Sequence, residues 1–176
     1  MTQYPTNFPA RINFLVELTI FATIAAGFHI IESYVNPTFF RIGLGNAVIL
    51  FLIRVKNFKL AAATLGLKVF FGSGVTGTLF SPIFIAILFA SASSFIVMFM
   101  FNRIPKLGPV AISIAGSCSH NLVILGFANI WINNIFSMLW PYFILFSIFS
   151  GSLTGLIVFY LEKYFKPIFL KHLDRV

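Results

Sequence analysis

Long apolar runs alternate with short polar breaks along the chain, and this pattern predicts the elements of the fold. The breaks delimit six apolar segments, at residues 14–34, 42–53, 58–71, 81–101, 110–130 and 137–161. Four of them reach the ~20 residues that an α-helix needs to cross the ~30 Å hydrocarbon core of a bilayer. The pattern therefore predicts an all-α fold: one integral membrane domain over residues 1–176, a polytopic bundle of six transmembrane helices.

The second and third segments are shorter than the others, and the basic stretch 54–59 separates them. A helix over residues 42–53 rises only about 18 Å. Fusing the two segments would place Arg54, Lys56 and Lys59 near the bilayer centre, where each cation costs about 2.5–3.5 kcal/mol. We therefore expect two short helices, whose ends are shielded by longer neighbours or open onto a cavity.

Composition supports a membrane environment. The chain is 59% hydrophobic and only 9% charged, whereas soluble domains are near 25% charged. A net charge of +8 would suggest nucleic acid in a soluble protein, but the basic residues here lie between and after apolar runs. We therefore expect lipid headgroups and no nucleic acid as partner. The single Cys118 excludes an internal disulfide and a cysteine-based metal cluster, and we expect no cofactor.

The distribution of Lys and Arg predicts the orientation of the helices. With the N-terminus inside, ten of the twelve basic residues fall on the inner side, and only Arg41 and Lys68 fall on the outside or in the outer helix halves. This positive-inside bias predicts a multi-pass protein of the cell (inner) membrane with both termini in the cytoplasm. The stretch after residue 165 mixes basic and apolar residues, which predicts a short interfacial helix.

Several polar residues fall within or beside the apolar segments, where an ionisable group is a functional hypothesis by default. His29 and Glu32 are three apart and share one helix face near the outer end of their span. One acid, two bases and two imidazoles could converge on the outer half, so a bound anion would balance the site. The predicted substrate-binding residues are His29, Glu32, Arg41, Asn46, Lys68, His120 and Asn121.

Structural explanations remain open for the same residues. Glu32 and Arg41 could form an interfacial ion pair, Lys68 could extend its ammonium to the outer headgroups, and His120 could be a hydrogen-bonded packing residue. We expect no metal, because two nearby cations oppose a three-ligand site made by His29, Glu32 and His120. Residues 72–78 lack the Gly-x-x-x-x-Gly-Lys-Ser/Thr pattern and predict a tight, hydroxyl-rich outer turn.

Small residues recur four apart on two of the segments. Ala22 and Ala26 lie one turn apart on the first, and Gly151 and Gly155 do so on the sixth. Small residues at this spacing allow another helix to approach closely. That helix could belong to a partner or to the same chain.

The motifs Arg41-Ile-Gly-Leu-Gly-Asn46 and Gly116-Ser-Cys-Ser-His120-Asn121 carry a family resemblance. From about residue 14 to residue 163 the chain resembles the Gx transporter family, often labelled heptaprenyl diphosphate synthase component I. That family often has Arg where this chain has Lys68, and a Gln shortly after His-Asn that is absent here. The change to Lys conserves the charge but loses the bidentate fork of Arg.

The family in turn resembles the S components of energy-coupling factor (ECF) transporters. Such a component captures a vitamin-like nutrient from outside and docks on a transmembrane T subunit driven by two ATPase subunits. The resemblance implies a non-enzymatic binding protein that docks on the T subunit through Ala22 and Ala26. The ligand would be an anionic, partly apolar small molecule, isoprenoid- or quinone-related or vitamin-like, with Arg41 and Lys68 meeting the anion.

Two other functions remain open. A prenyl diphosphate synthase needs paired Asp-rich motifs for magnesium, but this chain has a single aspartate, Asp174, so only an accessory role fits that label. The chain could also be a stand-alone carrier or the membrane subunit of a redox assembly. Glu17 and Glu162 are predicted to be isolated near the inner surface, which disfavours a proton relay across the spans.

Overall fold

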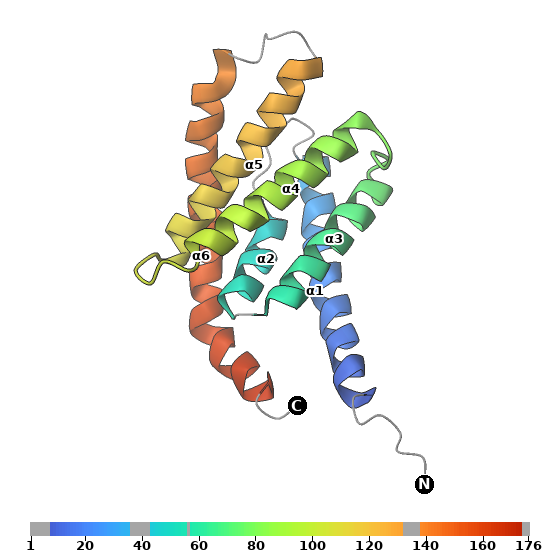
Figure 1. Cartoon of the computed structure of the whole chain (residues 1–176), viewed down its shortest axis with the longest axis vertical. Helices are drawn as coiled ribbons and strands as arrows, with labels where there is room; N and C mark the ends of the chain where they lie inside the picture. The colour runs from blue at the N-terminus through green and yellow to red at the C-terminus, as the bar shows by residue number, and fades with distance from the viewer. Residues whose placement is uncertain (1–7, 36–42, 56, 132–137, 174–176) are drawn as a thin grey trace.

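The computed structural model describes residues 8–35, 43–55, 57–131 and 138–173, and it describes side chains between residues 12 and 165 of these ranges. The described residues form six helices and confirm the all-α prediction (Figure 1). The helices are α1 (Phe8–Val35), α2 (Leu44–Arg54), α3 (Phe58–Val75), α4 (Pro82–Phe101), α5 (Pro109–Trp131) and α6 (Trp140–Leu173).

Five of these helices, all except α2, are long and apolar enough to cross a membrane. Large apolar side chains are exposed on the outside of the bundle, including Phe89 at 56% and Phe149 at 69%. An apolar surface of this kind has lipid as its solvent. The chain is therefore a multi-pass membrane protein with five candidate spans. The remaining predicted span, at residues 42–53, is α2, which has only 11 residues and is too short to cross by itself.

Helix α2 lies in the middle of the bundle, between α1 and α6 and behind α4 in Figure 1. It contacts each of the other five helices, and every residue from Ala47 to Ile53 is buried. Its longer neighbours shield it, as its length predicted. The carboxyl end of α2 points toward the end of the bundle where α1 begins and α6 ends.

Two helices extend further than the sequence predicted. Residues 72–75 continue α3, and the turn begins only at Thr76, whose hydroxyl donates to the Gly72 carbonyl at 2.9 Å. The prediction of a turn from residue 72 was wrong because hydroxyl side chains satisfy the last carbonyls of this helix. Lys68 consequently lies about two turns inside α3. The predicted separate helix after residue 165 is instead a continuation of α6 through Leu173.

The small residues pack helices of this chain against one another. A Cβ atom on Gly151 would lie 2.6 Å from the Cα of Ile114, and one on Gly155 would lie 2.5 Å from the Cα of Val110. Only glycine allows α5 and α6 to approach this closely. Ala22 and Ala26, on α1, are 6% and 7% exposed. Both are covered within the chain, so a partner would contact them only after α1 moved.

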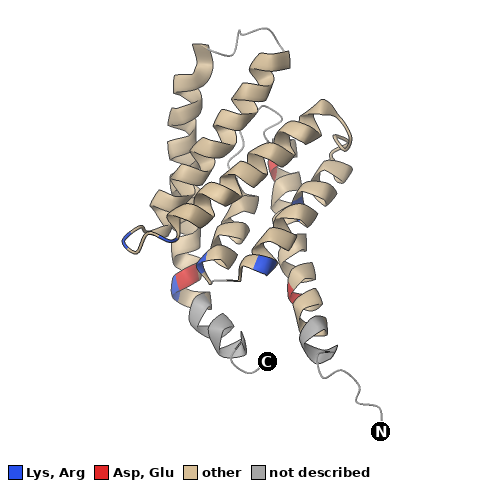
Figure 2. Cartoon of the chain, in the orientation of Figure 1, with Lys and Arg blue, Asp and Glu red and all other residues tan. Residues whose placement is uncertain are grey.

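Basic residues gather at one end of the bundle, where α1 begins, α6 ends and the α2–α3 and α4–α5 connections lie (Figure 2). This asymmetry agrees with the positive-inside pattern. The orientation with both termini in the cytoplasm stays a prediction.

Candidate functional site

A polar cavity lies inside the bundle, and we call it the polar chamber. Its volume is about 20 Å³. It brings together six of the seven predicted substrate-binding residues: His29, Glu32, Asn46, Lys68, His120 and Asn121. The seventh, Arg41, lies outside the described residues. The chamber is also lined by Gly43, Ser91, Ser94, Met98, Ser113, Ser117 and Thr154.

Lys68 lies within the bundle and not at its surface. Its side chain is 4% exposed, and its ammonium donates to Oδ1 of Asn46 at 2.5 Å. The alternative that Lys68 extends to the outer headgroups is therefore wrong, because α3 continues for two more turns beyond it. Lys68 and Asn46 instead join α3 to the first turn of α2.

Glu32 meets the amino end of α2. It is 6% exposed, and its carboxylate accepts a hydrogen bond from the backbone N–H of Leu44, the first residue of α2. That N–H has no partner within the helix, and a negative charge is favourable at this end of the helix dipole. Glu32 and Lys68 therefore place one acid and one base in the chamber.

Two glycines make room for chamber side chains: Gly45 for Lys68 and Gly72 for His29. A Cβ on Gly45 would lie 2.9 Å from Cε of Lys68 and 2.9 Å from the carbonyl oxygen of Ala25. A Cβ on Gly72 would lie 2.2 Å from Cδ2 of His29. The Gly-Leu-Gly-Asn motif thus has a steric role: its second glycine lets α2 lie against α1 and leaves room for the Lys68 side chain.

The opposite wall of the chamber comes from α4, α5 and α6. Asn121 is 2% exposed, and its Nδ2 donates to Oγ of Ser147 at 2.7 Å. Its Oδ1 and the Oγ of Ser94 are among the buried side-chain atoms that have no hydrogen-bond partner in the described part of the chain. Leaving such an atom unpaired costs about 1–3 kcal/mol. Unpaired atoms of this kind are expected where a ligand or a water completes the bonding.

The sequence prediction missed the hydroxyl groups of this wall. Ser113, Ser117 and Asn121 are spaced four apart on α5, and Ser91, Ser94 and Met98 follow a three- and four-residue spacing on α4. Both spacings place residues on one helix face. Serines in apolar helices are ordinary packing residues, so only their alignment with His120 and Asn121 could have indicated the site.

His29, Glu32 and His120 all line the chamber. In the part of the chain that the structure describes, no three His, Cys, Asp or Glu residues form a group that could hold a metal ion. The chamber instead offers an ammonium, a carboxylate, imidazoles, amides and hydroxyls, which suits hydrogen bonding to a small polar group.

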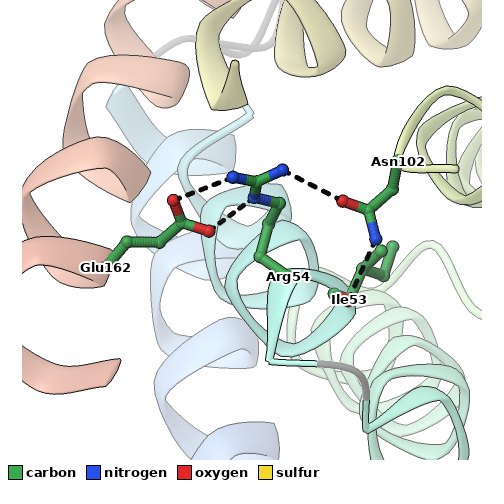
Figure 3. A network of polar contacts seen from close by, with 4 residues as sticks. All are labelled: Ile53, Arg54, Asn102 and Glu162. Carbon is green, nitrogen blue, oxygen red and sulfur yellow. Dashed lines mark hydrogen bonds and ion pairs between the residues drawn. The ribbon is translucent and has the colours of Figure 1, made fainter. Parts of the chain in front are cut away.

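A second polar cluster lies at the basic end of the bundle, and we call it the ionic brace (Figure 3). Arg54 donates from Nε and Nη2 to the two carboxylate oxygens of Glu162, at 2.5 and 3.2 Å. Its Nη1 donates to Oδ1 of Asn102 at 3.3 Å, and Nδ2 of Asn102 donates to the Ile53 carbonyl at 3.3 Å. The brace ties α2 to α6 and to the end of α4. The prediction that Glu162 is isolated was wrong, because α6 brings it beside the last residue of α2.

A family model described as heptaprenyl diphosphate synthase component I matches residues 21–161. The chain belongs to this family. The match covers most of the chain and confirms the resemblance that the two motifs carried. It includes every residue of the polar chamber and, except for Glu162, the whole ionic brace. No curated protein and no solved structure matches the chain.

Proposed function

We propose that this protein is the substrate-binding S component of an ECF-type importer, and that it binds a small molecule by a polar group held in the polar chamber, without catalysing a reaction. One observation carries the proposal. Residues from all six helices converge on a chamber in which Asn121 and Ser94 have buried polar atoms without a partner in the described part of the chain. A bound ligand would supply those partners.

The proposed ligand has an anionic group and an apolar part. Lys68 and His120 would meet the anionic group, and Asn121 would orient it. Arg41, which the sequence places at the outer end of the same region, adds a second base against the single acid Glu32. No phenylalanine among the described residues lines the chamber itself, so the apolar part would extend beyond it, against side chains such as Phe28 on α1. The importer would add a T subunit and two ATPase subunits.

The first test is to identify and bind the ligand. Mass spectrometry of the purified protein identifies candidate anions that co-purify. The affinity of each anion is then measured for the parent protein and for Lys68→Ala. We expect a loss of tenfold or more, because a hydrogen bond to a charged group contributes about 1.5–3 kcal/mol. Lys59→Ala is the matched control, since Lys59 is exposed on the same helix. An unchanged affinity in Lys68→Ala would remove the anion site.

Co-purification tests the partner. Recovery of a T subunit with two ATPases supports the importer. Recovery of a soluble synthase supports the second candidate, an accessory membrane subunit of a prenyl diphosphate synthase, which the family description favours. Robust uptake into vesicles that lack any ATPase would favour a stand-alone carrier instead.

A further inference from the structure

A large apolar groove lies on the side of the bundle, between α1 and α6. Its volume is about 640 Å³, and its lining is entirely apolar, including Phe21 on α1, Val48 and Phe51 on α2, and Leu161 on α6. In the described ranges α1 and α6 do not contact one another, although each contacts α2. The groove is therefore a gap between two spans, and α2 forms its floor.

The groove and the polar chamber share walls. At three places one residue lines the groove while its immediate neighbour lines the chamber. These pairs, groove residue first, are Phe28 and His29, Leu44 and Gly43, and Ala47 and Asn46. Two of the three pairs are in or beside the first turn of α2, so the amino end of this helix separates the two spaces.

The two volumes differ in what they can hold. A cavity of about 20 Å³ has room for one or two water-sized groups, such as the two oxygens of a carboxylate, whereas sites for small molecules measure about 300–1,000 Å³. The chamber by itself admits only a small polar group. The groove, at about 640 Å³, has room for the rest of a ligand but has no polar group to orient it.

We infer that the chamber and the groove are two halves of one site for a single-chain amphiphile with a carboxylate head. The head lies in the chamber beside Lys68, and the hydrocarbon chain passes the first turn of α2 into the groove. This inference rests on the proposed function and specifies its ligand class. A phospholipid is excluded by size, because its phosphate and glycerol do not fit a chamber of about 20 Å³.

Selectivity for such a ligand comes from the head. Moving a hydrocarbon chain from lipid into an apolar groove gains little, because lipid tails are as apolar as the groove. An ordinary bilayer chain would therefore occupy the groove regardless of the chamber residues. An amphiphile held by its head would leave the groove when Lys68 is lost.

The test uses the full-length protein in phosphatidylcholine nanodiscs and palmitate that carries a diazirine at its methyl end. We expect saturable photolabelling of groove residues such as Phe51 and Leu161, in excess of Leu88, which is exposed to lipid on α4. Unlabelled palmitate should compete. Lys68→Met should lower groove labelling at least tenfold, and Val48→Trp, which fills the groove, should do the same.

Leu122→Trp, at an exposed position on α5, is the control for Val48→Trp and should label normally. Thermal unfolding of each variant establishes that it is folded. If Val48→Trp does not fold, Lys68→Met alone provides the test. Even labelling around the bundle would overturn the inference, as would groove labelling that persists in Lys68→Met, the result expected for bilayer lipid or for a partner's helix. If a tail-less anion binds in a Lys68-dependent way while the groove stays unlabelled, the proposed function stands and this inference fails. If no anion binding depends on Lys68, both fail.

Discussion

The two ends of α2 carry two polar clusters that differ in how completely they are bonded. At its carboxyl end, the ionic brace uses both oxygens of Glu162 and both polar groups of Asn102. At its amino end, the polar chamber uses the Nδ2 of Asn121 but leaves the Oδ1 without a partner in the described chain. The brace is partly exposed at the basic end of the bundle, whereas Asn121 and Ser94 are buried, so an unpaired polar atom costs more in the chamber than in the brace.

This difference separates a structural cluster from a binding site. A fully bonded polar network stabilises one arrangement of the helices, whereas a partly bonded one costs free energy. The brace therefore accounts for how α2, α4 and α6 are held together. The chamber is better explained by a ligand that completes its bonding, and the predictions below test this contrast.

The largest expected effect is on stability. Glu162→Ala leaves the half-buried guanidinium of Arg54 with Asn102 as its remaining partner in the brace. We expect the free energy of unfolding to fall by about 2–3 kcal/mol, below the value for a fully buried pair because both side chains are partly exposed. Denaturant unfolding in detergent measures this, and ligand affinity of the folded fraction should not change.

The double variant Arg54→Met/Glu162→Leu is the control. It removes both charges and should recover most of the lost stability, because apolar pairs of similar size often replace ion pairs without loss. If Glu162→Ala weakened ligand binding as much as it weakened stability, the brace would belong to the binding site and the contrast would fail.

The next prediction perturbs the chamber without substituting any of its polar residues. A Cβ added at Gly72 meets the imidazole of His29 at 2.2 Å, so Gly72→Ala forces that ring to move. We expect ligand affinity to fall about tenfold, equivalent to about 1.4 kcal/mol. Isothermal titration with the ligand identified by mass spectrometry gives the affinity.

Gly74→Ala is the matched control on the same helix, because an added Cβ there meets nothing within 4 Å. It should leave affinity unchanged and raise stability slightly, since alanine is favoured over glycine within a helix. Equal affinity in the two variants would show that the position of His29 does not matter for binding.

The sequence predicted the fold class and most of the chamber because lipid penalises buried charge. His29, Lys68 and His120 stood out against apolar runs, and the three- and four-residue spacing rule placed His29 and Glu32 on one face. It could not predict the pairing of Arg54 with Glu162, which are 108 residues apart. It also could not predict the role of Ser94, because a serine in an apolar helix is common, and only its neighbours in space distinguish it.

The smallest expected effect compares two asparagines that differ in bonding. Asn102→Leu removes the bonds to Arg54 and to the Ile53 carbonyl, so the free energy of unfolding should fall by about 1 kcal/mol. Asn121→Leu removes an amide whose oxygen is unpaired, and Ser147 keeps its bond to the Phe143 carbonyl at 2.6 Å. Its stability should stay within about 0.5 kcal/mol of the parent, while ligand affinity falls. Denaturant unfolding and ligand titration of both variants measure the two quantities. Equal destabilisation would mean that Asn121 serves the fold as Asn102 does, and the unpaired oxygen would then no longer indicate a ligand.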